Sequence, residues 1–296
     1  MDRRNFMKLI GGSLAVSRKE SESFNHMSNI TNDKSYSHVI NNRPDRLMLS
    51  YYNDEFRLEK GNVTVIASRP SVGRSNLIQN LVQDTFMSQD ISIGYLSHVK
   101  KPFLLDRMIA AQQILGASDI YSTIDRLSKS NVVINDTQQI TMNELENIIV
   151  SMVKNHNIQL LAIDGFENIY LKDRNHDETV SIVFSYLNVI SKYLNIPIIV
   201  TTRLNRDLEK RNDKRPRLTD LNNYRVIEQS VATIIYLYRD DVYEQNSEYK
   251  GLAEITFEHA DGRNNGVILM EYDGRQSCFK RYKPHMIDEY NSAAWI

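Results

Sequence analysis

The sequence predicts an α/β fold in which a mostly parallel β-sheet is flanked by helices and ends in antiparallel hairpin strands. Two observations lead to this class. From residue 57 onward, short apolar runs alternate with longer amphipathic stretches, and strands that alternate with helices form parallel βαβ units. After Ala232 the helical stretches end and three strands are expected, the last two joined by a turn at Asp273-Gly274. These closing strands should pair antiparallel at one edge of the sheet.

The expected elements follow one another as strand and helix in turn. Buried strands are indicated by β-branched or aliphatic runs at residues 63–67, 91–96, 132–134, 160–163 and 196–200. Amphipathic helices are indicated at residues 76–87, 103–115 and 179–194. A further helix is expected to begin at Thr141, because Glu144 follows three residues later and the two form a capping box.

Length and composition allow one large α/β domain with a short extension, or at most two small domains. The chain has 296 residues, 41% of them hydrophobic and 25% charged. Its 36 Lys and Arg nearly balance its 37 Asp and Glu, so no global basic field indicates nucleic acid, although a local basic channel is not excluded. The single cysteine, Cys278, excludes an internal disulfide framework and is typical of a reducing cytoplasm. No apolar run approaches the ~20 residues that a membrane span needs, so we expect a cytoplasmic protein with no membrane partner.

The domain organisation follows from a change in composition near residue 46. Residues 1–45 are expected to form a polar N-terminal arm or linker, 46–283 the folded domain and 284–296 a C-terminal tail. The start of the arm, Arg3-Arg4-Asn5-Phe6-Met7-Lys8, is similar to a twin-arginine export signal. The apolar run that follows is short and has no clear small-residue cleavage site, so we interpret it as part of the arm.

A glycine-containing turn joins the first buried strand to the first helix. It reads Ser68-Arg69-Pro70-Ser71-Val72-Gly73-Arg74-Ser75, with Asn76 next. Backbone N–H groups at a helix N-terminus hold phosphates, so this is the context that a P-loop requires. Gly73 would let the backbone approach a ligand closely, and Ser75 is placed to bind Mg²⁺ through its hydroxyl. Residues 68–76 are therefore the predicted site for the phosphates of ATP.

Two residues of this turn depart from the general P-loop pattern. Ser68 stands where a glycine is usual, and Arg74 stands where a lysine is expected. A guanidinium is planar and forked, whereas the lysine ammonium is a compact point charge that fits between the β- and γ-phosphates. Polyphosphate binding is compatible with this change, but positioning of the γ-phosphate is in doubt. The alternative interpretation is a strand–turn–helix that binds no ligand.

Asp164 supports the nucleotide-binding interpretation. It ends the aliphatic run at residues 160–163, which is the Walker B arrangement, in which an aspartate at the end of a strand holds Mg²⁺. A strand that ends at a solvated aspartate is the plainer alternative. The two motifs occur in the expected order, so Ser75 and Asp164 are the predicted metal-binding residues.

A series of motifs in the C-terminal half resembles the motor domain of DnaB-type replicative helicases. The matching segments are Leu204-Asn205-Arg206, Leu208-Glu209-Lys210-Arg211, Asp213-Lys214-Arg215-Pro216, Ile227-Glu228-Gln229 and Tyr238-Arg239-Asp240-Asp241-Val242-Tyr243. Arg69-Pro70-Ser71-Val72-Gly73, Asp136-Thr137 and Lys250-Gly251-Leu252-Ala253-Glu254-Ile255 also match. The resemblance extends roughly from Arg57 to Tyr282. It implies a RecA-like P-loop NTPase core that binds ATP between the subunits of a hexameric ring around single-stranded DNA.

The resemblance also shows where the family's chemical residues are replaced. His98 stands at the position of the family's catalytic glutamate, and Arg203 at that of the glutamine that senses the γ-phosphate. His98 is alternatively a simple surface residue. The DNA-facing loop reads Asn222-Asn223-Tyr224-Arg225, in which Arg225 alone keeps a phosphate-binding charge. His259 and Asp261 replace the family's lysine and arginine finger, unless a two-residue shift brings Arg263 into the finger's place.

These replacements leave three hypotheses. In the first, the protein binds nucleotide, hydrolyses it weakly or not at all, and joins or modulates a replicative helicase ring. In the second, it is an active ATP-dependent helicase or translocase, in which Glu167, Arg203 or Arg263 takes over the lost roles. In the third, it is a DNA-binding or scaffold protein that binds no nucleotide. Homo-hexamers and mixed rings, both on single-stranded DNA, are the expected assemblies.

Overall fold

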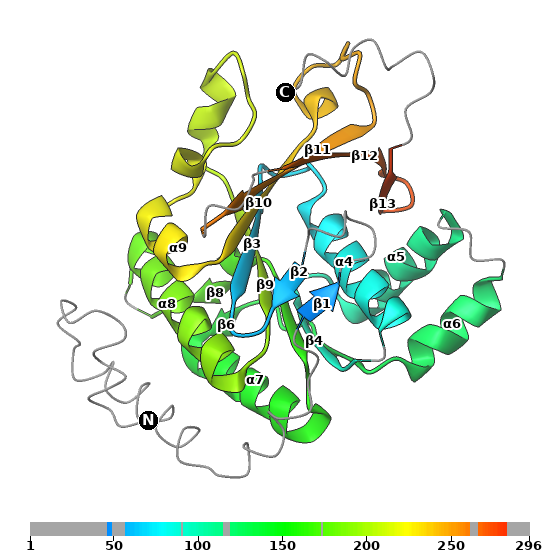
Figure 1. The fold of residues 1–296 in the computed structure, drawn as a ribbon, viewed down its shortest axis with the longest axis vertical. Helices are drawn as coiled ribbons and strands as arrows, with labels where there is room; N and C mark the ends of the chain where they lie inside the picture. The colour runs from blue at the N-terminus through cyan, green and yellow to red at the C-terminus, as the bar shows by residue number, and fades with distance from the viewer. Residues whose placement is uncertain are drawn as a thin grey trace.

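The structure is a computed structural model that describes residues 46–48, 57–89, 91–114, 119–172, 174–260 and 266–282. A nine-stranded sheet of order β13-β12-β11-β10-β3-β9-β7-β4-β5 forms its centre (Figure 1). Its strands are β3 (Val63–Ser68), β4 (Ile93–Ser97), β5 (Val132–Asn135), β7 (Leu160–Asp164), β9 (Ile198–Arg203), β10 (Thr233–Tyr238), β11 (Leu252–His259), β12 (Val267–Asp273) and β13 (Cys278–Arg281). The strands from β10 to β5 in this order pair in parallel, whereas β11, β12 and β13 pair antiparallel.

This topology confirms the predicted fold class and corrects the number of closing strands. Within the described residues, four strands follow Ala232, where three were expected from the sequence. The difference arises because β10 extends the parallel set beside β3, and three antiparallel strands follow it. The predicted turn begins at Asp273, whose Oδ1 accepts hydrogen bonds from the backbone N–H groups of Arg275 at 2.9 Å and Gln276 at 3.2 Å.

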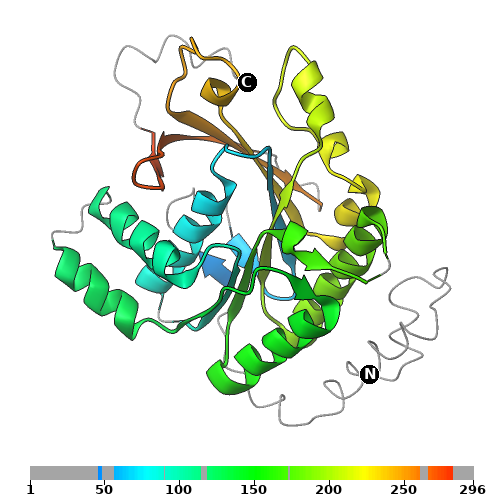
Figure 2. The same cartoon turned by 180° about the vertical axis from the view of Figure 1, so that it is seen from behind.

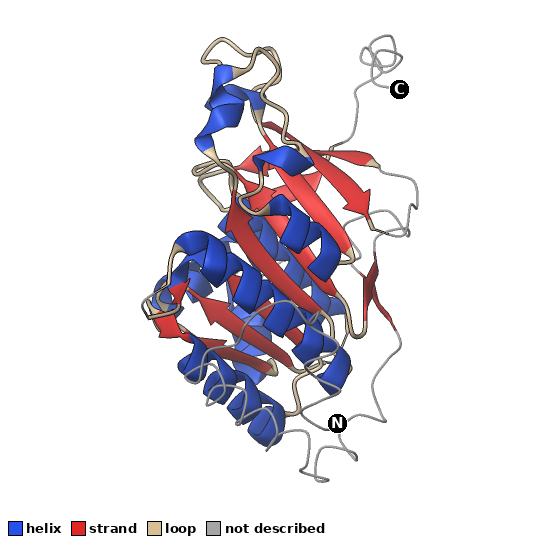
Figure 3. Cartoon of the chain, turned by 90° about the vertical axis from the view of Figure 1, so that its left-hand side faces the viewer, coloured by secondary structure: helices blue, strands red, loops and turns tan. Residues whose placement is uncertain are grey.

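Helices cover both faces of the sheet (Figures 1 and 2). They are α4 (Arg74–Ser88), α5 (Lys101–Ile114) and α6 (Ile120–Lys129) on one face, and α7 (Met142–His156), α8 (His176–Leu194) and α9 (Tyr224–Ser230) on the other. The short helices η3 (Arg206–Lys210) and η4 (Leu218–Asp220) follow β9 and project at one end of the molecule (Figures 1 and 3). The predicted helices correspond to α4, α5, α7 and α8, whereas α6 and α9 were not predicted.

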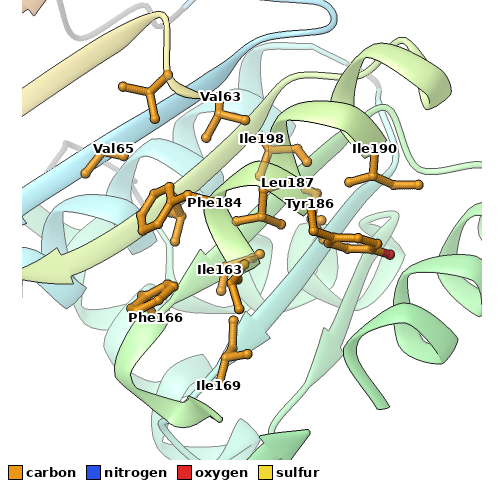
Figure 4. Close-up of a cluster of buried hydrophobic side chains, with 14 of the residues drawn as sticks. Val63, Val65, Ile163, Phe166, Ile169, Phe184, Tyr186, Leu187, Ile190 and Ile198 are labelled. Atoms are coloured by element: carbon orange, nitrogen blue, oxygen red, sulfur yellow. The ribbon is translucent and has the colours of Figure 1, made fainter. Parts of the chain in front are cut away.

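The sheet has a hydrophobic core on each face because successive side chains of a strand point in opposite directions. Val63 and Val65 of β3 pack in the cluster that includes α7 and α8, whereas Ile66 packs in the cluster that includes α4. Figure 4 shows the first cluster, in which the rings of Phe166 and Phe184 stack with centroids 4.9 Å apart. The central strands are buried on both sides, which explains why their sequences are almost wholly apolar.

Local sequence signals set the starts of the helices. The predicted capping box is confirmed at α7, where Thr141 caps the helix and exchanges hydrogen bonds with Glu144. Helix α6 is capped by Asp119, whose carboxylate accepts from the backbone N–H groups of Tyr121 and Ser122. Such caps satisfy N–H groups that have no partner within the helix.

Shorter elements complete the described secondary structure. β1 (Arg46–Met48) pairs with β2 (Arg57–Glu59), and β6 (Ile140–Thr141) pairs with β8 (Ile169–Tyr170). Single turns of helix form η2 (Phe166–Asn168) after β7 and η5 (Asp240–Val242) after β10. Among the described helices, none combines the length and apolarity needed to cross a bilayer. The predicted arm at 1–45 and the tail at 284–296 lie outside the described residues.

We expect Phe184→Ala to lower the free energy of unfolding by about 3–5 kcal/mol, because it removes a large buried ring from a packed core. The Phe184 side chain is fully buried against Phe166. Chemical denaturation with circular dichroism measures the change. Tyr121→Ala, at a side chain that is 77% exposed on α6, is the control and should change stability by less than about 0.5 kcal/mol. Equal effects of the two substitutions would contradict this core.

The single thiol offers an independent check on the packing of the hairpin that β12 and β13 form. Cys278 is buried in β13, and burial raises the pKa of its thiol to about 11. Because the thiolate is the reactive form, we expect Cys278 to resist a thiol reagent at pH 8 until the protein is unfolded. The thiol ionises more easily in the unfolded chain, so its contribution to stability should decline as the pH rises from about 8.5 towards 11. Rapid labelling of the native protein would contradict the packing of β13.

Candidate nucleotide-binding site

The parallel register gathers the predicted site residues at one edge of the sheet. Ser68, the last residue of β3, lies opposite Arg203, the last residue of β9. Asp164, the last residue of β7, lies opposite Ser97 of β4, and His98 follows directly. Because β9 lies between β3 and β7, residues from distant parts of the chain meet at the carboxyl ends of the strands, where open α/β sheets bind their ligands.

The predicted phosphate loop connects β3 to α4. Gly73 caps the helix with φ of 114°, a conformation that residues with a side chain rarely adopt. A Cβ atom at this position would lie 2.9 Å from Cζ of Phe279, so the loop also passes too close to β13 for any larger residue. Ser71 has a positive φ of 68° as well. The loop thus ends with backbone N–H groups at the start of a helix that has no acidic residue in its first turn, which is the arrangement that suits an anion.

A cleft of about 340 Å³ opens over this loop. Its lining includes seven of the nine predicted cofactor-binding residues, together with His98 and Arg203: Arg69, Pro70, Ser71, Gly73, Arg74, Ser75 and Asn76. The other two predicted residues of the loop, Ser68 and Val72, are fully buried, and the Ser68 hydroxyl donates to the carbonyl of Arg69 at 2.9 Å. The volume lies at the lower end of the range typical of small-molecule sites.

Ser75 and Asp164 form the pair expected of a metal site. The Ser75 hydroxyl donates to Oδ1 of Asp164 at 3.0 Å, across 89 residues of sequence. Thr201 of β9 donates to the same oxygen at 3.0 Å and accepts from the N–H of Gly165 at 2.7 Å. A hydroxyl and a carboxylate are hard oxygen donors, which Mg²⁺ prefers. Among the described residues, no group of three or more His, Cys, Asp or Glu side chains is placed to hold a metal ion.

His98 lies in the cleft rather than on an open surface. Its Nδ1 is 3.3 Å from Oδ2 of Asp164 and 3.2 Å from the carbonyl oxygen of the same residue. A hydrogen bond to Asp164 raises the pKa of His98, and partial burial opposes the rise. His98 is therefore paired with the carboxylate that is expected to hold the metal.

A second carboxylate in the cleft engages the arginine at the P-loop lysine position. Both Oε atoms of Glu167 accept from the guanidinium of Arg74, each at 3.3 Å. The Nε of Arg203 lies 4.0 Å from Oε1 of Glu167. The Arg74 and Glu167 side chains are 11% and 20% exposed, whereas Arg203 is 60% exposed. Arg74 and Arg203, the two predicted phosphate-facing cations, thus converge on one carboxylate.

Contacts from far along the chain hold the loop in place, and no sequence motif indicated them. Asn76 donates to the hydroxyl of Tyr272 at 2.7 Å, and the guanidinium of Arg239 lies 4.1 Å from the centroid of the Tyr272 ring. Arg69 donates to the carbonyl of Leu204 at 2.8 Å and pairs with Glu209 at 2.7 Å. The resemblance had singled out the segments around Arg239 and Glu209 without a role for these side chains.

The remaining predicted residues lie elsewhere. Arg225 is exposed on α9, where its Nε donates to the hydroxyl of the neighbouring Tyr224 at 3.4 Å. His259 lies in β11, and its Nδ1 is 3.0 Å from the hydroxyl of Thr233 in β10. Arg263, the alternative arginine finger, is outside the described residues.

Comparison with known proteins identifies the family. The profile of the DnaB-like helicase C-terminal domain matches residues 56–281. The chain belongs to this family. The match agrees with the extent of the resemblance inferred from the motifs.

Curated relatives of this DnaB-family chain are replicative helicases. The chain is 27% identical over 249 residues to the replicative DNA helicase DnaB of Buchnera aphidicola subsp. Acyrthosiphon pisum, a match that covers 78% of this chain and 54% of that protein. It is 27% identical over 226 residues to the replicative DNA helicase DnaC of Bacillus subtilis, covering 71% of this chain and 49% of the relative. The chain thus spans about half the length of these relatives.

Solved structures share the fold. An isolated ATPase domain superposes with a TM-score of 0.69 at 22% identity, covering 90% of this chain and 99% of that chain. A DnaB-like replicative helicase, described together with its interactions with primase, superposes with a TM-score of 0.66 at 24% identity, covering 76% and 58%. The RecA-like architecture predicted from the sequence is confirmed.

We expect Asp164→Asn to weaken Mg²⁺-dependent nucleotide binding by roughly 10–100-fold, because it removes the charge that holds the metal. Calorimetric titration with ADP, with and without Mg²⁺, measures this change. Asp125→Asn is the matched control, because it removes the same charge from an exposed pair with Lys129 on α6 and should change nothing. Unaltered Mg²⁺ dependence in Asp164→Asn would contradict the metal site.

Proposed function

We propose that this protein binds a Mg²⁺–nucleotide in the cleft, hydrolyses ATP weakly or not at all, and acts in DNA replication by joining or modulating a replicative helicase ring. Backbone N–H groups around Gly73 would hold the phosphates, and Ser75 with Asp164 would hold the Mg²⁺. When bound, Mg²⁺ would neutralise charge on the phosphates. Single-stranded DNA is the expected nucleic acid, and both homo-hexamers and mixed rings are consistent with membership of the family.

The observation that carries this proposal is the pairing of Arg74 with Glu167. The parts of the site that frame a nucleotide are present: the loop, the start of α4 and the contact between Ser75 and Asp164. The groups that would act on the terminal phosphate are altered, because Arg74 is engaged by a carboxylate and His98 stands after β4 where a glutamate is expected. Loss of a general base typically costs ~10²–10⁴ in rate, and loss of an arginine finger ~10³–10⁵.

One observation favours the alternative of an active helicase or translocase. Glu167 lines the cleft and lies three residues after Asp164. Its carboxylate would therefore face a water molecule that attacks the nucleotide. Its pairing with Arg74 counts against this role, because a base must be available to the water. Turnover would require Glu167 to leave Arg74 when ATP binds.

The experiment that tests the proposal measures ATP–Mg²⁺ binding and hydrolysis side by side, with and without single-stranded DNA. We expect saturable binding with turnover at least about a hundredfold below that of an intact DnaB-type helicase assayed in parallel. DNA-stimulated hydrolysis that disappears in Asp164→Asn would support the active alternative instead. A protein that is not stabilised against heat by ATP–Mg²⁺ at high concentration would be a scaffold without nucleotide.

The partner is tested separately. The protein is mixed with an intact DnaB-type helicase, and native mass spectrometry measures the masses of the assemblies. We expect rings of mixed composition. Mixed rings, or a change in the helicase's unwinding rate at equimolar mixing, would support a modulating role. Separate species with unchanged unwinding would contradict it.

A further inference from the structure

The position of Glu167 bears on which nucleotide the cleft accepts. In P-loop proteins, the residue that corresponds to Arg74 contacts the β- and γ-phosphates of the nucleotide. In this chain that residue is an arginine, and its forked guanidinium holds both oxygens of Glu167. A guanidinium fork matches carboxylates and phosphates in the same way. Glu167 therefore accepts the hydrogen bonds of the Arg74 guanidinium as a terminal phosphate would.

The carboxylate is held at this place by the backbone as well as by Arg74. Gly165 has φ of 98°, which turns the chain sharply after Asp164 into the short helix η2. Phe166 is 1% exposed and stacks on Phe184, which anchors the turn in the core. The φ of Gly165 is strained for any residue with a side chain, and a Cβ atom there would also lie 2.5 Å from Nδ2 of Asn168. Movement of Glu167 is thus limited to its side chain.

The charges in this part of the cleft favour a shorter polyphosphate. Arg203 lies 4.0 Å from the same Glu167 oxygen, so the carboxylate stands between the two cations that would face a terminal phosphate. A γ-phosphate in contact with Arg74 would have to displace Glu167 and would remain close to its negative charge. The loop backbone, Ser75 and Asp164 are separate from this pair and are available to a β-phosphate with its Mg²⁺.

We propose that Glu167 takes the place of a terminal phosphate and makes the cleft selective for a nucleoside diphosphate over a triphosphate. This inference rests on the proposed nucleotide-binding function and specifies its ligand. The cleft then holds its preferred ligand without a phosphate to hydrolyse, and the Arg74–Glu167 pair stays closed in the bound protein.

The test compares ADP with a non-hydrolysable ATP analogue, AMP-PNP, by calorimetry in the presence of Mg²⁺. We expect the wild-type protein to bind ADP at least about tenfold more tightly than AMP-PNP. Glu167→Gln keeps the size of the side chain and removes its charge, so AMP-PNP should bind about tenfold more tightly to this variant while ADP changes less than about threefold. Asp125→Asn, which removes an equal charge on α6, should leave both affinities unchanged.

A second measurement uses the wild-type protein alone. Beryllium fluoride binds in the place of a γ-phosphate beside ADP, so it should not tighten ADP binding while Glu167 holds Arg74. Equal affinity for ADP and AMP-PNP, or tightening by beryllium fluoride, would overturn the inference and leave nucleotide binding intact. Failure to bind either nucleotide would overturn both this inference and the proposed function.

Discussion

The hydrogen bond from Ser75 to Asp164 depends on the alignment of three strands. Ser75 follows β3, Asp164 ends β7, and β9 lies between these strands. Thr201 of β9 joins the network by donating to Asp164 and accepting from Gly165. A shift of one residue in any of these strands would turn its side chains to the opposite face of the sheet. The hydrophobic alternation that builds the two cores therefore also fixes the geometry of the candidate metal site.

Arg74 and Glu167 are best understood together. An arginine at the P-loop position brings a forked, permanently charged group into a cleft that already contains other arginines. A largely buried cation is costly without a partner, and Glu167 supplies one through two hydrogen bonds. Arg74 and Glu167 thus form one ion pair. Ser75, Asp164 and His98 form a separate group of contacts. In the proposed function, this separation would let the site bind a phosphate chain although the groups that would act on its end are rearranged.

The fold and part of the site could be predicted from the sequence for identifiable physical reasons. The double-sided burial of the central strands makes their sequences apolar, and the capping box at Thr141 is local, so both leave clear signals. Ser75 and Asp164 were found because Ser75 lies at the start of the helix after a buried strand and Asp164 ends another strand, each in a recognisable pattern. Helices α6 and α9 were missed because they are short, with 10 and 7 residues. The pairing of Arg74 with Glu167 joins residues 93 positions apart, and neither neighbourhood reveals the other. The predicted number of strands after Ala232 was wrong. An apolar run does not show whether its strand joins the parallel set, as β10 does, or the antiparallel strands that follow it.

The hairpin of β12 and β13 supports the candidate phosphate loop although the two are far apart in the sequence. Gly73 can adopt a φ of 114° because it has no Cβ atom, and the same absence leaves room for the rings of Phe279 and Tyr272. Asn76 binds the Tyr272 hydroxyl, Arg239 stacks on the Tyr272 ring, and the guanidinium of Arg239 also donates to the carbonyl of Val72 in the loop. The loop is therefore held from one side by the hairpin and from the other by Asp164. The antiparallel edge of the sheet thus supports the phosphate loop as well as extending the parallel core.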